Sequence, residues 1–195
     1  MQFTTLLPPA AAHAGTRRSH LLIDADRPAD ARYQVSASTY VAGLDDEPVL
    51  QVRVKAGAGW AIFGLDGEGV LRAAAWGRTF AQALERWADP MMSFGLAPLR
   101  ETYAMLPPRD THAGPRRSSL LLDHDDPDRA GNQLSAKRLN TSDGELLQLR
   151  IWTAGCWTQV VLDDALGFAA FAAADTEKAA WKAAQAGLRA RGWTL

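Results

Sequence analysis

The sequence has a single cysteine and no long hydrophobic run. Cys156 is the only cysteine among 195 residues, so no disulfide can form within one chain. This cysteine usage is typical of a reducing compartment, and we expect a cytoplasmic location. No stretch approaches the roughly 20 apolar residues that a membrane-spanning helix needs, and the opening residues lack the basic and apolar segments of a signal peptide. We therefore expect no membrane partner.

The chain also lacks an excess of charge of either sign. Its 21 Lys and Arg residues nearly balance 22 Asp and Glu residues, for a formal net charge of −1. No overall field draws such a chain to nucleic acid, so any site for a polyanion must be a local patch. The hydrophobic content of 47% is that of an ordinary folded protein.

Catalytic and metal-binding signatures are missing as well. The sequence contains no G-x-S-x-G, no P-loop and no G-x-G-x-x-G. One cysteine and a few scattered histidines do not supply the spaced ligands of a zinc site. The pairs Asp24-x-Asp26 and Asp123-x-Asp125 have the donor atoms for a divalent cation, but such pairs before a proline are more often turn formers. We expect no enzyme activity, no catalytic residue, no metal and no cofactor.

What the sequence does contain is an internal repeat. The stretch LPPAAAHAGTRRSHLLIDADRP, from Leu7 to Pro28, matches LPPRDTHAGPRRSSLLLDHDDP, from Leu106 to Pro127, with 14 of 22 positions identical. Further along, Trp60 aligns with Trp157. The repeat predicts two units, residues 1–99 and 100–195, packed about a pseudo-twofold axis as one domain.

Each unit is predicted to hold an antiparallel sheet of four or five strands followed by one helix, which makes the fold α+β. The strands of the first unit are expected at Arg18–Ile23, Tyr33–Val41, Val49–Lys55, Trp60–Leu65 and Val70–Ala74. Those of the second unit are expected at Arg117–Leu122, Gln133–Leu139, Leu146–Trp152, Trp157–Leu162 and Phe168–Ala172.

Helical spacing of apolar residues follows the strands in both units. The first helix is expected to bury Phe80, Leu84 and Trp87 and to end at Asp89-Pro90. The second is expected to begin at Asp175 as its N-cap and to bury Trp181, Ala184 and Leu188. The proline-containing stretch Ser93–Pro108 is expected to be a linker leading into the second unit.

Alternation along the strands leaves one polar face on each sheet. Gln51, Arg53 and Lys55 share this outer face in the first unit, and no carboxylate lies among them. Single-stranded nucleic acid uses basic and aromatic surfaces of this kind, since guanidinium groups hold phosphates while rings stack on bases. The candidate nucleic-acid contacts are Arg17, Arg18, Arg53, Lys55, Trp60, Arg116, Arg117, Lys137, Arg150, Trp152 and Trp157.

These residues also have a purely structural interpretation. An antiparallel sheet with one wet face shows Gln, Ser and Arg there in any case. The doubled Arg pairs at residues 17–18 and 116–117 are close in sequence to Asp clusters that could pair with them. Trp60 and Trp157 are typical core or interface anchors.

The order of elements in the two units resembles the Whirly group of single-stranded DNA-binding proteins, which in turn resemble the single-unit dimers of the transcriptional coactivator class. The likeness covers the order of elements along the whole chain, and the lysine-rich strand motif of the plant members is absent. In that group the sheets bind the strand and the helices build the core, which implies outer faces that present Arg53 and Arg150.

The leading hypothesis is non-enzymatic binding of single-stranded DNA or RNA with little sequence preference. A protein-interaction or regulatory adaptor module is the alternative, and a small-molecule binder with Trp60 and Trp157 in its cavity wall is a further one. Self-association into a homo-oligomer is compatible with each of them.

Overall fold

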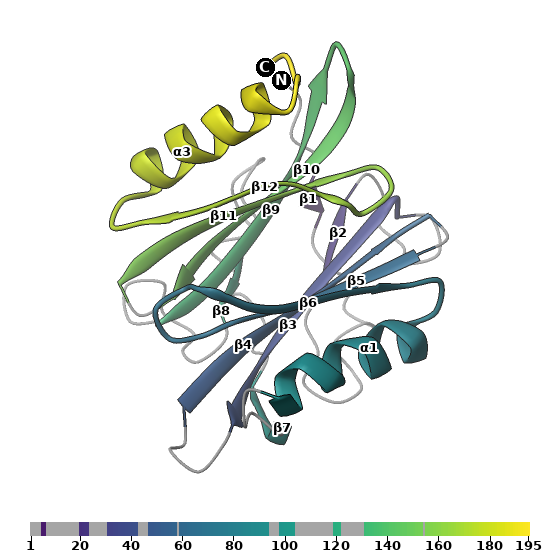
Figure 1. Cartoon of the computed structure of the whole chain (residues 1–195), viewed down its shortest axis with the longest axis vertical. Coiled ribbons are helices and arrows are strands. Elements are labelled where there is room, and N and C mark those ends of the chain that lie inside the picture. Colours follow the sequence, from purple (N-terminus) through teal and green to yellow (C-terminus); the bar gives the residue numbers. More distant parts are fainter. Residues whose placement is uncertain are drawn as a thin grey trace.

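The computed structural model holds two antiparallel sheets and two helices (Figure 1). It describes residues 5–6, 20–23, 31–42, 47–57, 59–93, 98–103, 119–121, 131–153 and 155–195. The predicted α+β class is confirmed at this level.

The first sheet contains seven strands in the order β1-β2-β3-β4-β5-β6, with β7 also paired to β3. Strands β2 and β7 lie along the same side of β3, one at each end. The bounds are β1 Thr5–Leu6, β2 His20–Ile23, β3 Tyr33–Ala42, β4 Glu47–Ala56, β5 Gly59–Leu65, β6 Leu71–Gly77 and β7 Pro98–Tyr103. Helix α1, Phe80–Ser93, follows β6.

The second sheet contains five strands in the order β12-β11-β10-β9-β8. The bounds are β8 Ser119–Leu121, β9 Asn132–Thr141, β10 Gly144–Thr153, β11 Cys156–Asp163 and β12 Phe168–Ala174. Helix α3, Glu177–Ala190, follows β12. Four consecutive antiparallel strands and a helix thus occur in the same order in both halves of the chain.

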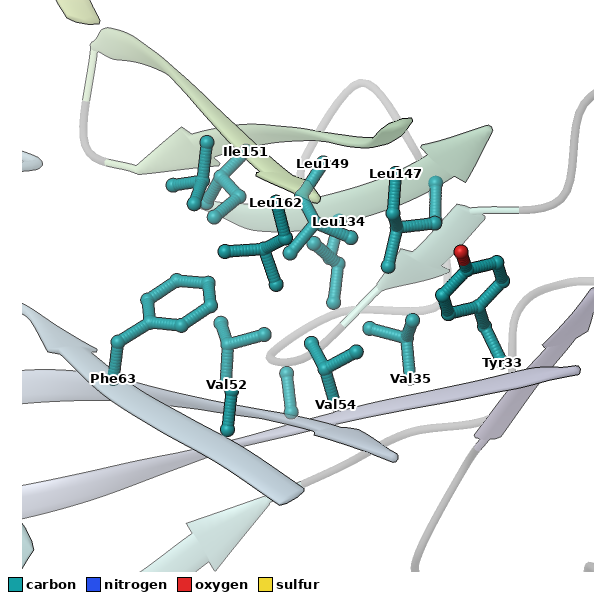
Figure 2. Close-up of a cluster of buried hydrophobic side chains, with 14 of the residues drawn as sticks. Tyr33, Val35, Val52, Val54, Phe63, Leu134, Leu147, Leu149, Ile151 and Leu162 are labelled. Atoms are coloured by element: carbon teal, nitrogen blue, oxygen red, sulfur yellow. The ribbon is translucent and has the colours of Figure 1, made fainter. Parts of the chain in front are cut away.

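The two sheets pack face to face, and their inner faces form the largest core cluster (Figure 2). Val35, Val52 and Phe63 of the first sheet point toward Leu134 and Leu149 of the second. All five side chains are fully buried. Burial of one such side chain contributes roughly 1.5–3 kcal/mol, so this layer dominates the stability of the chain.

The helices cover the outer faces of the sheets, which gives four layers in the order α1, first sheet, second sheet, α3 (Figure 1). Helix α1 packs on β5 and β6 through Ala83 and Trp87, while α3 packs on β11 and β12 through Ala184 and Leu188. The alternation of polar residues suggested that the outer faces are exposed to solvent. In the structure they are partly covered. A helix lies over the outer half of each.

The central strands lie where the alternation predicts them, apart from small shifts at their ends. Residues 98–103 differ from the prediction, because they form β7 instead of a linker. This segment begins with a proline and lacks clear alternation, so its pairing is set by the free side of β3 and not by local pattern. Strand β7 crosses the predicted boundary between residues 99 and 100.

The helix ends differ from the prediction in two places. Helix α1 continues through Pro90 to Ser93, since the missing N–H of proline costs one bond near the end of a helix without stopping the chain there. The N-cap of α3 is Thr176 and not Asp175, because the Thr176 hydroxyl accepts the Ala179 N–H at 3.2 Å. Leu84, expected in the core, is 37% exposed.

Two aspartates build the turns that follow β5 and β11. One carboxylate oxygen of Asp66 accepts the backbone N–H groups of Glu68 and Val70 at 2.9 and 2.8 Å. Asp163 accepts those of Ala165 and Gly167 at 3.0 and 2.7 Å in the same pattern. Each side chain thereby satisfies two donors that the turn itself leaves without a backbone acceptor.

Replacing Asp66 by alanine is expected to lower the free energy of unfolding by about 1–3 kcal/mol, because two partly buried N–H groups lose their acceptor. The second carboxylate oxygen also holds Arg72 at 2.5 Å. Asp66→Asn keeps the acceptor for the turn and is expected to lose less than half as much. Urea unfolding of the two variants measures this, and an unchanged midpoint for Asp66→Ala would contradict it.

Polar contacts also join the two sheets at one end of the core. The Tyr33 hydroxyl donates to Glu145 at 2.7 Å, and Arg32 and Arg138 lie 2.9 and 3.3 Å from the same carboxylate. Burial, followed by the bond to Glu145, raises the pKa of the Tyr33 phenol far above its usual value. Tyr33 therefore remains a neutral donor that links β3 to β10.

Candidate nucleic-acid interface

Polar and aromatic side chains share the outer face of β9, β10 and β11. The strand register places Trp152 beside Trp157, and Arg150 between Ser135 and Gln159. Since alternate residues of a strand face the same side, the set continues along the strands to Lys137 and Gln148. We call these seven residues the polar face of the second sheet: Ser135, Lys137, Gln148, Arg150, Trp152, Trp157 and Gln159.

Two tryptophans form one end of this face. The ring centroids of Trp152 and Trp157 lie 5.3 Å apart at an interplanar angle of 48°. Both residues are only partly buried. Rings held together in this way lose little conformational freedom on binding and keep part of their surface available for stacking.

Arg150 lies next to the tryptophans and reaches the first turn of α3. Its guanidinium is 2.9 Å from the Glu177 carboxylate, and the two side chains are 24% and 44% exposed. Thr176 caps the helix and so fixes Glu177 as its first residue. Among the described residues, the Nε–H of Arg150 has no acceptor. The ion pair therefore leaves one buried donor of the guanidinium unsatisfied.

Lys137 lies on the neighbouring strand and is a second cation on the same face. Its ammonium is 5.6 Å from the centre of the Trp181 ring, an arrangement that the ring's quadrupole favours. Burial and then the charge of Arg150 lower the pKa of Lys137, and Glu177 opposes this effect. Lys137 and Arg150 thus place two cationic side chains on the same face, close enough for the charge of one to affect the other.

The corresponding face of the first sheet buries its central arginine. Arg53 is 5% exposed, and its Nε donates to the Gln51 side chain at 2.6 Å, so the expectation that it faces solvent is wrong. Trp60 packs edge-on against Phe80 of α1 with centroids 5.2 Å apart. Lys55, next to Trp60 in the register, is half-buried. The structure therefore gathers Lys137, Arg150, Trp152 and Trp157 on one face and leaves Arg53 and Trp60 within packed surroundings.

The four remaining candidates, Arg17, Arg18, Arg116 and Arg117, lie outside the described residues, as do both Asp-x-Asp pairs. In the part of the chain that the structure describes, no three Asp, Glu, His or Cys side chains come together as a metal site. Neither of the two described helices is long and apolar enough to cross a membrane.

Two hollows of about 380 and 340 Å³ lie away from this face, on either side of Trp76. They are formed by β6 and the turn between β11 and β12, and Leu166 contributes to both. Neither is lined by Trp60 or Trp157, the tryptophans expected in the wall of a small-molecule cavity.

The sequence did not identify three residues that shape the polar face: Gln159, Glu177 and Trp181. In the predicted repeat Gln159 aligns with Ile62, and this exchange of an apolar for a polar residue at an outer position was the available signal. Glu177 and Trp181 are in α3, and nothing in the sequence of that helix shows which strands it covers.

No known protein family matches this chain, and no curated protein or solved structure is significantly similar to it.

Proposed function

We propose that this chain is a non-enzymatic, cytoplasmic protein that binds single-stranded nucleic acid, with little sequence preference, through the polar face of the second sheet. The observation that carries the proposal is the pair Trp152 and Trp157 next to two cations, Arg150 and Lys137. Stacking of a base on an aromatic ring contributes roughly 1–3 kcal/mol, and it tolerates any base because each has a flat face. The cations supply contacts to phosphates.

A tandem duplication forms part of the proposal, with units at residues 1–99 and 100–195 related by a pseudo-twofold axis as in the Whirly group. It is supported by the common order of elements, by the matching turns at Asp66 and Asp163, and by Thr79 and Thr176, whose hydroxyls each accept an N–H at the start of a helix. In this proposal the two copies have diverged. The first closed its outer face around Arg53, and the second kept its face available.

Replacing Arg150 and Lys137 together by alanine is expected to weaken binding of a fluorescent 15-residue oligonucleotide at least tenfold at low salt. The logarithm of the wild-type affinity should fall with the logarithm of salt concentration by roughly 0.7 per neutralised phosphate, and the variant should show a smaller slope. Arg78→Ala removes an exposed cation elsewhere and serves as the control. Fluorescence polarisation measures all three, and undetectable binding by the wild type would refute the proposal.

Glu177→Gln should act in the opposite direction in the same assay. Glu177 occupies the guanidinium that the proposal assigns to a phosphate, so removing its charge should raise the affinity roughly two- to fivefold, the range of a partly exposed ion pair. A decrease would mean that Glu177 positions Arg150 for binding instead of competing for it.

A protein-interaction module is the second candidate function. Trp76 favours it, because this residue is 44% exposed on β6, the last strand in the order of the first sheet, between the two hollows. A strand at the edge of a sheet can pair with another chain, including a second copy of the same protein. Co-purification of a defined protein without nucleic acid favours this candidate. An ultraviolet absorbance ratio that indicates bound nucleic acid, and that falls on nuclease treatment, favours nucleic-acid binding.

A further inference from the structure

Two glutamines of the polar face of the second sheet are fully buried. Gln148 is 1% exposed and Gln159 is 0% exposed. The Gln148 Nε2 donates to Gln159 Oε1 at 2.6 Å. Among the described residues, Gln148 Oε1 and Gln159 Nε2 have no partner. Turning both amides over would leave the same inventory, which is one free acceptor and one free donor.

Among the described residues, the two aligned positions of the first sheet are not a pair of glutamines with unpaired groups. Gln51, which aligns with Gln148, accepts a hydrogen bond from Arg53. Ile62, which aligns with Gln159, is fully buried in the apolar cluster under α1. A buried polar group without a partner is costly, and an apolar residue of similar size is available at this position in the other sheet. The second sheet therefore retains an unsatisfied donor and acceptor that stability alone does not favour.

We infer that Gln148 and Gln159 read the hydrogen-bonding edge of one unpaired nucleobase, an inference that rests on the proposed function. Every base presents donors and acceptors along its edge, and single strands leave that edge accessible. Trp157 is two residues from Gln159 along β11, roughly 7 Å away at the rise of an antiparallel strand. A base next to the tryptophan pair therefore lies within one step of the glutamines, which it can reach when the side chains that bury them move aside.

Lys137 lies directly beside Gln148 on the neighbouring strand. This side chain is paired with Gln148 in the register and extends toward Trp181 of α3. Its flexible four-carbon stem can turn outward, where its ammonium meets a phosphate of the incoming strand. We expect this movement to uncover Gln148 and to add a contact with the nucleic-acid backbone in the same step.

The experiment compares two oligonucleotides of 15 residues with the full-length protein. One is oligothymidine, and in the other every thymine is replaced by 2,4-difluorotoluene, which has nearly the same shape and stacks but forms no comparable hydrogen bonds. The wild type is expected to prefer oligothymidine roughly 5- to 150-fold, the value of two ordinary hydrogen bonds. Fluorescence polarisation at fixed salt gives both affinities.

The variant Gln148→Leu/Gln159→Leu removes the donor and the acceptor together and is expected to bind both oligonucleotides equally. Gln159→Ile introduces the residue found in the first sheet and keeps the Gln148 amide, so it is expected to lower the preference to that of one hydrogen bond, roughly 2- to 13-fold. Gln51→Leu is the matched control and should keep the wild-type preference.

Equal and tight binding of both oligonucleotides by the wild type would overturn this inference and leave the proposed function standing, with an ordered water as the partner of the two amides. A preference that is undiminished in Gln159→Ile would also overturn it. Binding of neither oligonucleotide would overturn the proposed function, and the inference with it.

Discussion

Replacing Trp152 and Trp157 together by alanine is expected to weaken the binding of a 15-residue oligonucleotide at least roughly 30-fold. Each ring offers one stacking surface worth roughly 1–3 kcal/mol, and two lost surfaces multiply in the affinity. The two rings are in contact. Each single variant therefore also removes the neighbour that holds the other ring in place. Each single effect therefore already includes part of the other ring's contribution, and the double variant is expected to lose less than the product of the single effects.

The control for this prediction is Trp76→Ala. Trp76 is 44% exposed on the first sheet, so its removal takes away a solvent-facing indole far from the polar face of the second sheet. The affinity of Trp76→Ala for the oligonucleotide should equal that of the wild type. Far-ultraviolet circular dichroism would verify that each variant remains folded. If the folded double variant bound with wild-type affinity, Trp152 and Trp157 would not stack on bases as proposed.

Replacing Gly69 by alanine is expected to lower the free energy of unfolding by about 2–4 kcal/mol. Gly69 has a φ of +74°, which costs an L-residue roughly 1–2 kcal/mol, and an added Cβ would lie 2.6 Å from the Thr158 hydroxyl oxygen. It would also lie 3.2 Å from the sulfur of Cys156. Thr158 donates to the Gly69 carbonyl at 3.0 Å, so the clash falls on a contact that joins the two sheets.

Two matched glycines separate backbone strain from crowding in this prediction. Gly57→Ala introduces a side chain at a φ of +47° with open space around it, so it should show the strain alone. Gly67→Ala meets neither obstacle and should change the stability by less than about 0.5 kcal/mol. Thermal and urea unfolding give the three values. A loss in Gly69→Ala no larger than that in Gly57→Ala would contradict the close contact between the turn and Thr158.

The sequence predicts the strands well because each central strand alternates one apolar and one polar side chain. Val52 and Val54 lie in the inner core while Gln51 and Arg53 face outward, as the period of two requires. The same pattern does not say what covers an outward face. Arg53 was therefore expected in solvent, although it is buried in the structure.

Contacts between distant segments account for the other differences. Strand β7 forms because a free side of β3 is available to it, a condition that local propensity does not encode. In the candidate site, Arg150 and Lys137 were identified from sequence, but their contacts Glu177 and Trp181 come from a helix placed by tertiary packing.

Each sheet in this protein is the permanent partner of the other. Leu149 and Ile151 of the second sheet are kept from water by Val52 and Phe63 of the first, all within a single chain. A protein made of one such sheet would have to find a second copy by collision, and its folding would depend on its own concentration. Here that encounter is intramolecular, so the first sheet is indispensable even with its outer face closed.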